Sequence, residues 1–452
     1  MLSYWKLHKI PILLALVSML FYAVLAYDLQ REDFLKLIAL FAALFFFLIK
    51  LIQFEKWNFK FLLVVGILFR LVFLVATPNL SQDFYRFIWD GELINQGINP
   101  YIFTPNELIE NPKFQIPNSS ALYDGMGSLS ARHFSNYPPV NQFIFTISAF
   151  LGFGNVLGSI IWMRLLIIAA DIGVVYLGRK LLQNLSQSPH LIFWYFLNPL
   201  VIIELTGNLH FEGVMLFFFV WAMYLISSGH PNKAAPIYAA SIMVKLVPVL
   251  FLPLFLRRLG LKKSILFYAW VGLSGLLFLF PFYNAQFIEN YFQTIGLWFS
   301  NFEFNAGIYN LVKQAAVHYF EAKPWILIKE YGTLVKILTL TLIVALALLR
   351  KHKKPSQLMN TMLLVLTTYY LLSATVHPWY LTFLLGLSIF TNYRFTILWS
   401  ALVILSYYAY SQPDFKENLW LLSLEYLLVF GYLGYEIVKN HNIMATIRKK
   451  LS

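Results

Sequence analysis

Long apolar runs separated by short polar segments extend along almost the whole chain. A helix needs about 20 apolar residues to cross the hydrocarbon core of a bilayer, and somewhat fewer when its polar ends reach the interface. Runs near this length lie at about 10–27, 34–52, 60–77, 155–178, 190–206, 211–228, 264–282, 328–349, 357–376, 379–391, 394–411 and 419–438. The pattern predicts an all-α polytopic membrane protein with about twelve transmembrane helices.

Residues 234–256 are also apolar, but they differ from the other runs. The sequence "KLVP" (245–248) divides them into two pieces, each too short to cross a bilayer. Basic residues flank the segment on both sides, as Lys233 and as "RRLGLKK" (257–263). We therefore expect a re-entrant helical hairpin that enters and leaves on one face of the membrane. Such breaks are tolerated where the backbone faces protein or a wet cavity.

Charge indicates the orientation. The net charge of +13 raises the possibility of nucleic acid as a partner, but 59% of the residues are hydrophobic and only 12% are charged. In membrane proteins, Lys and Arg collect in cytoplasmic loops. Twelve crossings with both termini in the cytoplasm put every basic cluster on the cytoplasmic side. Since this orientation explains the positive charge, we expect no nucleic acid as a partner. The clusters are Lys6 with Lys9, Lys56 with Lys60, Arg179 with Lys180, residues 257–263, "RKHKK" (350–354) and Lys439 with residues 448–450.

This orientation puts two long segments, at about 78–154 and 283–327, on the periplasmic or extracellular face of the plasma (inner) membrane. We treat residues 1–452 as one integral membrane domain.

The first run has an alternative interpretation as a signal peptide cleaved after Val24-Leu25-Ala26. Its apolar run at 10–27 is longer than the roughly 7–15 residues of a typical signal peptide core. The chain contains no cysteine, which excludes disulfides and thiolate metal sites.

A polar stretch, "LSQDFYRFIWDGELINQGINPYIFTP" (80–105), opens the first outer segment. Its spacing predicts a helix over 82–95 with Asp83, Arg86 and Asp90 on one arc and an apolar arc beside it. Gly97 and the following Asn-Pro pair end the helix. We expect this helix to lie on the outer leaflet with its charges directed at one place. The alternative is an ordinary interfacial helix with a solvated face.

Three further polar motifs are expected near the same end. "GNLHFEG" (207–213) links two spans on the outer side, and "HPWYL" (377–381) lies at another outer span end. Lys245 occupies the tip of the predicted hairpin. His210 alone has an alternative role as a helix cap, and the Trp and Tyr of "HPWYL" have one as membrane-interface anchors.

Arg164 and Asp171 stand seven residues apart inside one predicted span. Charges inside a membrane are costly and usually pair or line a functional cavity. The two residues are therefore either part of a cavity, a structural pair, or a bridge to a neighbouring helix. Together the polar groups indicate a cavity that opens outward, with carboxylates at the aqueous rim and cations closer to the lipid. A cation at headgroup depth suits a lipid-borne phosphate, and a carboxylate outside it suits a general base.

The residues at 81–101 carry a resemblance to a known group of enzymes. "SQDFYRFIWDGELINQGINPY" resembles the Asp-x-x-Arg-[Tyr/Phe]-x-Trp-Asp-Gly…Gly-x-Asn-Pro-Tyr signature of bacterial GT-C glycosyltransferases, and is most similar to polyprenol-phosphate-mannose-dependent mannosyltransferases. "GNLHFEG", "VKLVPVLFLP" and "HPWYL" follow in the order that this group shows, so the resemblance covers roughly residues 60–385.

The resemblance implies a GT-C fold with interfacial helices in the first outer loop, an acidic catalytic residue there, and a sugar carried on a lipid phosphate. The catalytic residue is then Asp83. Some of these enzymes have paired acids, whereas here Gln82 precedes Asp83, which favours acid–base chemistry without a metal. We expect no cofactor. The expected substrate-binding residues are Arg86, Asp90, Tyr101, Asn208, His210, Glu212, Lys245, His377 and Tyr380.

The expected reaction is inverting transfer of a sugar, mannose by the resemblance, from a polyprenyl-phosphate donor to a hydroxyl of a glycan or glycolipid at the outer face of the bilayer. Two alternatives use the same groups: a transporter or flippase of lipid-linked glycans, and a polymerase or ligase of such glycans with His377 or His210 as base. The large outer loop and the lack of a visible internal repeat argue against a transporter.

Overall fold

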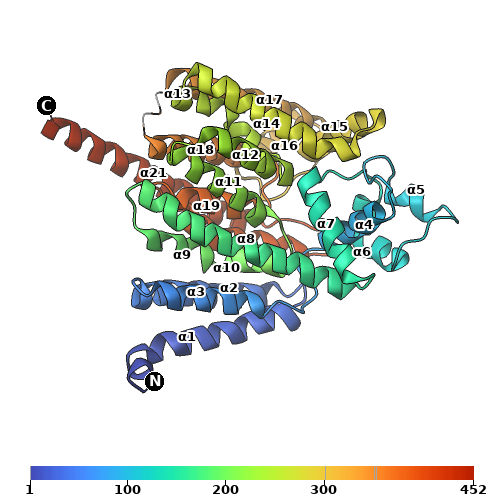
Figure 1. Cartoon of the computed structure of the whole chain (residues 1–452), viewed down its shortest axis with the longest axis horizontal. Coiled ribbons are helices and arrows are strands. Elements are labelled where there is room, and N and C mark those ends of the chain that lie inside the picture. Colours follow the sequence, from blue (N-terminus) through green and yellow to red (C-terminus); the bar gives the residue numbers. More distant parts are fainter. Residues whose placement is uncertain (1, 301, 351, 353, 452) are drawn as a thin grey trace.

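The protein consists of helices that lie mostly side by side, with a group of shorter helices gathered at one end (Figure 1). The computed structural model describes residues 2–300, 302–350, 352 and 354–451. Within them the secondary structure is helical apart from an isolated parallel bridge between Phe304 and Thr375. The all-α class is thus confirmed. Residues 351 and 353 of the predicted basic cluster, and the side chains of residues 441–452, lie outside the described part.

Six helices in the described residues are long and apolar enough to cross a membrane by themselves, and they coincide with six of the predicted runs. The other runs form shorter helices, so the count of twelve crossings stays a prediction. The six are α1 (Leu2–Tyr27), α2 (Phe34–Glu55), α8 (Val156–Asn184), α14 (Leu261–Leu279, continued by η4, Phe280–Phe282), α17 (Pro324–Leu349) and α21 (Leu419–Leu451). The shorter ones include α3 (Phe59–Leu71), α11 (Glu212–Ser227), α18 (Pro355–Leu372), α19 (Tyr380–Ile389) and α20 (Phe395–Leu402), which η5 (Val403–Ser411) continues.

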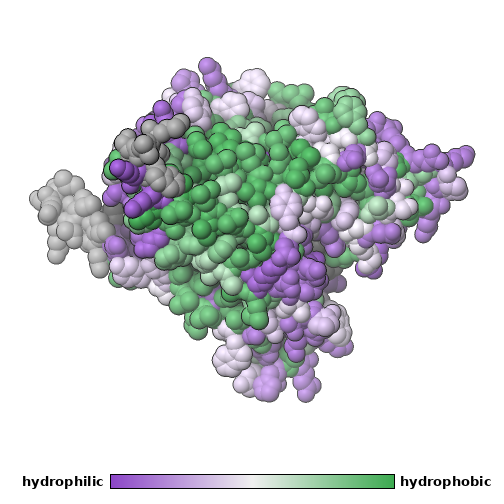
Figure 2. All heavy atoms as spheres, turned by 90° about the horizontal axis from the view of Figure 1, so that it is seen from below, coloured by the Kyte–Doolittle hydropathy of each residue, from purple (hydrophilic) through white to green (hydrophobic). Residues whose placement is uncertain are grey.

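The surface agrees with a membrane protein. On the face shown in Figure 2, apolar side chains cover a broad central area, and polar side chains lie around it, among them those at the end that carries α4–α6. Both chain termini lie toward the opposite end (Figure 1). The chain is therefore an integral membrane protein whose polar helices and termini occupy opposite ends.

The run predicted at 190–206 is a broken span. It consists of η1 (Pro189–Ile192), α9 (Phe193–Phe196), α10 (Pro199–Val201) and η2 (Ile202–Gly207), and its two halves meet at 54°. Pro199 lacks a backbone N–H and interrupts the helix, while the side chain of Asn198 accepts a hydrogen bond from the Leu200 N–H at 3.0 Å. The second half ends in a π-helical turn, a form that often occurs at functional sites. This turn carries Glu204, which is fully buried.

The intramembrane charges Arg164 and Asp171 do not pair with each other. Asp171 forms a buried ion pair at 2.8 Å with Arg70 of α3, so it is a bridge to a neighbouring helix. Arg164 donates to four backbone carbonyl oxygens, those of Leu74, Ala76, Thr206 and Gly207. Since α3 ends at Leu71, earlier than the predicted run 60–77, the carbonyls of Leu74 and Ala76 lack helical partners and the guanidinium pairs with them instead.

The predicted break at "KLVP" is present. Helix α12 (Pro231–Val244) ends at Lys245, whose backbone is extended, and the 3₁₀ helix η3 (Val247–Phe255) follows before α13 (Leu256–Leu259). The two legs are held together where the Tyr238 hydroxyl donates to the carbonyl of Pro248 at 2.7 Å. At 1.5 Å per residue, the 14 residues of α12 span about 21 Å. Its entry into and exit from the membrane on one face stays a prediction.

The predicted helix at 82–95 is α4 (Asp83–Asn95), and Gly97 follows it with a φ of +75°. Most of α4 is buried against α6 (Ser119–Ala131) and α7 (Pro139–Gly152), and its position on the outer leaflet stays a prediction. Gly91 permits the close crossing with α7, because a Cβ there would lie 2.4 Å from the backbone oxygen of Phe145. The short α5 (Pro105–Ile109) connects this group.

The second predicted outer segment packs against the first. Helix α15 (Ala285–Ser300) brings Phe287 and Tyr291 onto the ring of Tyr101, and Asn290 donates to the Tyr101 carbonyl at 3.0 Å. Helix α16 (Gly307–Phe320) follows. The two long polar segments are thus joined at one end of the helix bundle.

Candidate active site

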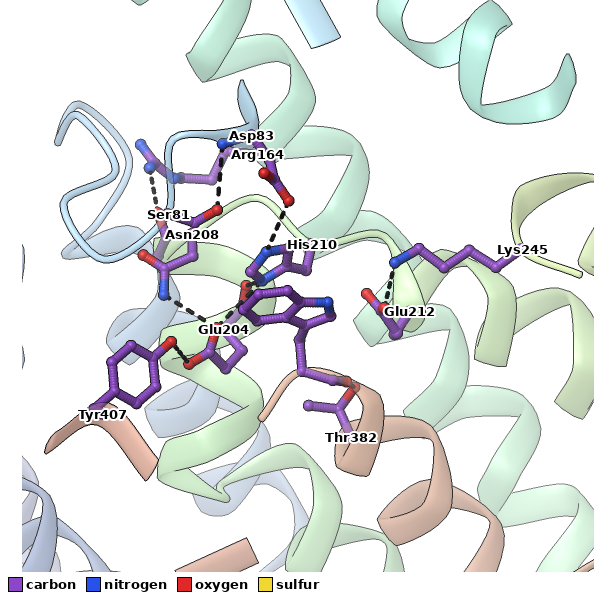
Figure 3. Close-up of polar contacts among 12 residues, drawn as sticks. Ser81, Asp83, Arg164, Glu204, Asn208, His210, Glu212, Lys245, Thr382 and Tyr407 are labelled. Carbon is purple, nitrogen blue, oxygen red and sulfur yellow. Dashed lines mark hydrogen bonds and ion pairs between the residues drawn. The ribbon is translucent and has the colours of Figure 1, made fainter. Parts of the chain in front are cut away.

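Asp83 is the first residue of α4 and lies at the rim of a cluster of polar side chains (Figure 3). Its side chain is 40% exposed, and its carboxylate oxygen Oδ2 lies 3.8 Å from Nε2 of His210. Its backbone N–H donates to the Ser81 hydroxyl at 3.3 Å. A carboxylate in the first turn of a helix is stabilised by the helix dipole. The structure therefore presents an ionised carboxylate that solvent and a substrate can reach.

His210 lies directly beneath Asp83 and is buried, with 2% of its side chain exposed. Its Nδ1 atom lies 3.2 Å from Oε2 of Glu204 and 3.1 Å from the Glu204 backbone oxygen. The ring stacks on Trp379 with centroids 4.0 Å apart. Leu209 adopts a φ of +61°, and this turn brings His210 back over the π-helical turn. His210 is therefore fixed between two carboxylates, one at the rim and one below.

Glu204 is the buried end of this chain of polar groups. The Tyr407 hydroxyl donates to its Oε1 atom at 2.6 Å, and the Asn208 amide donates to Oε2 at 3.2 Å. Figure 3 shows Tyr407 and Asn208 converging on Glu204, with Asp83 on the far side of His210. The carboxylate is thus hydrogen-bonded on both oxygens, as a buried charge requires.

Electrostatics favour an ionic Asp83–His210 contact. Burial opposes protonation of His210, but the neighbouring carboxylates of Asp83 and Glu204 outweigh it and raise the pKa of His210 to about 9. Burial acts to raise the pKa of Asp83, but His210, with the charge of Lys245, lowers this pKa below its ordinary value. At neutral pH the pair is therefore an imidazolium facing a carboxylate.

Lys245 and Glu212 form an ion pair on the other side of His210 (Figure 3). Glu212 is the first residue of α11, and Lys245 ends α12, so the hairpin places the ammonium beside the site. The second carboxylate oxygen of Glu212, Oε2, is buried and has no hydrogen-bond partner in the described residues. Tyr380 places its ring centre 6.0 Å from the Lys245 ammonium. Lys245 is thus neutralised by a protein carboxylate.

His377 belongs to an aromatic stack rather than to the set of cations. Its ring lies 4.3 Å from that of Trp379 and 5.0 Å from that of Phe304, in near-parallel orientation. Burial, and then the charges of His210 and Lys245, lower the pKa of His377 to about 3 against the opposing effect of Asp83. The ring is therefore neutral at physiological pH, and the expected role of His377 in substrate binding stays a prediction.

Two of the predicted substrate ligands are held in a buried hydrogen-bond network. Arg86 pairs with Asp90 at 2.7 Å and donates to the carbonyls of Ser130 and His133. Asp90 is fully buried and also accepts from Ser135 at 2.6 Å. These contacts attach α4 to the end of α6 and to the residues that follow it, and they give Arg86 and Asp90 a clear structural role.

Tyr101 is likewise enclosed. Its hydroxyl donates to the carbonyl of Tyr137, and its ring lies among Phe282, Phe287 and Tyr291. The structure therefore brings together Asp83, Asn208, His210, Glu212, Lys245, His377 and Tyr380 of the predicted set, and it holds Arg86, Asp90 and Tyr101 in the packing around α4.

Sequence reasoning did not assign Glu204 or Tyr407 to the site. Glu204 is a lone acid in an apolar run, "LVIIELTG" (200–207), and that isolation inside a membrane segment was a usable signal. Tyr407 gave no signal, because it stands in the aromatic run "YYAY" (407–410) and meets Glu204 only through the fold.

Comparison with known proteins shows that the sequence is similar to those of sugar transferases. The family described as "Alpha-(1->6)-mannopyranosyltransferase, N-terminal domain" matches residues 34–259. The chain is 24% identical over 218 residues to alpha-(1->6)-mannopyranosyltransferase A of Mycobacterium tuberculosis, covering 46% of this chain and 40% of the relative. It is 27% identical over 156 residues to alpha-(1->6)-mannopyranosyltransferase B of Corynebacterium glutamicum, covering 34% of this chain and 24% of that relative. The matched part thus spans less than half of either relative.

Proposed function

Because the chain belongs to the alpha-(1->6)-mannopyranosyltransferase family, we propose that it is a glycosyltransferase that moves mannose from a polyprenyl-phosphate donor to an acceptor hydroxyl at the outer face of the membrane. The observation that carries the proposal is the accessible Asp83 carboxylate above a buried His210–Glu204–Tyr407 chain. All of these residues except Tyr407 lie within the matched range 34–259.

In the proposed reaction Asp83 is the general base. It accepts the proton of the acceptor hydroxyl while the hydroxyl oxygen forms a bond to the anomeric carbon of mannose. The bond between that carbon and the donor phosphate oxygen breaks, and the phosphate leaves with the electron pair. Attack from the face opposite the phosphate inverts the configuration. The lowered pKa makes Asp83 a weak base, which suffices when the hydroxyl proton becomes acidic as the new bond forms.

The buried chain below Asp83 supports this role. The charged His210 ring orients Asp83 and keeps it ionised, and the ring is itself held by Glu204. Polar groups that the fold already holds in place can stabilise charge in the transition state without having to reorganise during the reaction. His210 and Glu204 are therefore positioning residues in the proposal, while Asp83 meets the substrate.

A lipid-borne donor suits the location of the site. Asp83 lies at the end that carries the polar helices α4–α6, away from the chain termini (Figure 1). If the termini are cytoplasmic, as the basic clusters predict, this end faces away from the cytosol and its nucleotide sugars. Lys245, whose ammonium pairs with Glu212 beside the site, is proposed to face the donor phosphate.

The test is mannosyl transfer by the purified protein. We expect product from a synthetic polyprenyl-phosphate mannose with an α-mannoside acceptor, and none from a nucleotide-activated mannose. Transfer from the nucleotide sugar alone would contradict the proposed donor. Movement of the lipid-linked sugar across vesicle membranes without transfer to the acceptor would instead identify a flippase.

A further inference from the structure

The loop between the first two helices carries a cation close to the residues that surround the site. Arg31 lies between α1 and α2, and its guanidinium carbon lies 3.7 Å from the centre of the Tyr410 ring. Among the described residues it forms no ion pair. Its Nε atom is buried and has no hydrogen-bond partner there. The loop acid Asp28 pairs with Lys36 instead.

Tyr410 connects Arg31 to the site by two routes. Its ring lies 5.2 Å from that of Tyr407, which donates to Glu204. It also lies 5.8 Å from the ring of Phe304, which stacks on His377. The charge of Arg31 is one of those that lower the pKa of His377, after burial and the nearer groups. Arg31 is therefore within electrostatic reach of the residues that surround Asp83.

The two cations near the site differ in how they are compensated. Lys245 is paired with Glu212, whereas Arg31 lies against the uncharged side chain of Tyr410 and has no acidic partner among the described residues. A guanidinium has five N–H groups, more than the contact with Tyr410 uses, and its planar fork matches two oxygens of a phosphate. A charge partly removed from water without a counter-ion is costly, so an anionic ligand would be stabilised there.

We propose that Arg31 binds the phosphate of the polyprenyl-phosphate substrate. This inference rests on the proposed function for the identity of the lipid. It makes the loop between α1 and α2 part of the binding site, although that loop precedes the family match at residues 34–259. Arg31 holds the phosphate in the donor, and it stabilises the charge that develops on the phosphate as the sugar leaves.

The experiment measures binding of a short-chain polyprenyl monophosphate to the purified full chain, which needs no turnover. The matched ligand is the polyprenol of equal length, which lacks the phosphate. The variants are Arg31→Gln and Arg31→Lys, with Arg132→Gln as control, because Arg132 is an exposed arginine of the same outer end that donates only to the carbonyl of Ser128 in the described residues. We expect Arg31→Gln to weaken monophosphate binding about ten-fold or more.

Arg31→Lys should recover part of that loss, because it keeps the charge but not the planar fork. Polyprenol binding should be the same in all four proteins. Unchanged monophosphate binding in Arg31→Gln would overturn the inference. An equal loss for monophosphate and polyprenol, with a lower melting temperature, would also overturn it by making Arg31 a structural residue. If Arg31→Gln lost binding of the monophosphate alone and the wild type transferred no mannose, the proposed function would be refuted. The inference that Arg31 binds the lipid phosphate would still stand.

Discussion

At the scale of single residues, the site is governed by the protonation of His210. The imidazolium lies between Asp83, which reaches solvent, and Glu204, which does not. If His210 lost its proton, two carboxylates would face a neutral ring, and Asp83 would lose the partner that orients it. The working form of the site is therefore the ionic pair, and pH provides a direct test.

We expect turnover to decline as the pH rises through about 9, the pKa to which the carboxylates raise His210. Because this pKa is raised in the folded state, the stabilisation from protonated His210 is complete below the unfolded value of about 6.5 and is lost as the pH passes 9. Turnover and melting temperature should be measured from pH 6 to 10 for the wild type and His210→Gln. The same alkaline decline in both proteins would contradict this assignment.

Lys245 offers a second test at this scale. We expect Lys245→Met to destabilise the protein by about 2 kcal/mol, because it leaves the nearly buried Glu212 without its counter-ion. The double variant Lys245→Met with Glu212→Gln should recover most of the loss. Thermal unfolding in detergent measures both. A single variant as stable as the wild type would show that Glu212 does not depend on Lys245.

Some of the site residues could be predicted from the sequence, and others could not. Asp83 and His210 stand out because they are polar groups in short segments beside apolar runs. Tyr407 contacts Glu204 across 203 positions of sequence, and no local pattern encodes such a contact. The neutral state of His377 depends on the enclosing rings of Trp379 and Phe304, which a linear sequence does not reveal.

At the scale of elements, the site depends on two interruptions of helices. The bend at Pro199 and the π-helical turn place Glu204 under His210, and the early end of α3 leaves carbonyls for Arg164. Sequence predicted the break at Lys245 and the helix after Gln82, because proline and glycine mark both. It did not predict the partner of Asp171, because Arg70 lies on a different helix 101 residues away.

The Arg70–Asp171 ion pair, which joins α3 to α8, allows a prediction about the stability of the helix packing. Both side chains are fully buried, so Arg70→Met leaves an uncompensated carboxylate and should cost about 3–5 kcal/mol of stability. Asp171→Asn combined with Arg70→Met removes both charges and should be closer to the wild type. The melting temperatures of the three proteins decide the point. A single variant with an unchanged melting temperature would refute a structural role for this pair.

At the scale of the whole molecule, function depends on which side of the membrane the polar end faces. Among the described residues, six helices, or seven if the bent pair crosses, are long and apolar enough to span a membrane, because half of the predicted runs form short or broken helices. The basic residues supply the orientation that the fold does not. Lys233 at the start of α12 and Lys113 in the outer segment are both exposed and lie on opposite sides in the proposed topology.

Cysteine labelling can test this topology because the chain has no cysteine of its own. An impermeant thiol reagent applied to intact cells should label Lys113→Cys and should not label Lys233→Cys. After permeabilisation both should react, which controls for accessibility. Labelling of Lys233→Cys alone in intact cells would place the site in the cytoplasm and contradict the outward-facing account.

The most direct measurement is the rate of mannosyl transfer from polyprenyl-phosphate mannose by Asp83→Asn. The substitution keeps the shape of the side chain and removes the base, so we expect turnover to fall by about 100-fold or more while the melting temperature and binding of the lipid monophosphate persist. Asp124→Asn is the matched control, because Asp124 is an exposed carboxylate on α6 in the same outer segment. An Asp83→Asn protein that turns over like Asp124→Asn would contradict the central claim that Asp83 is the catalytic base.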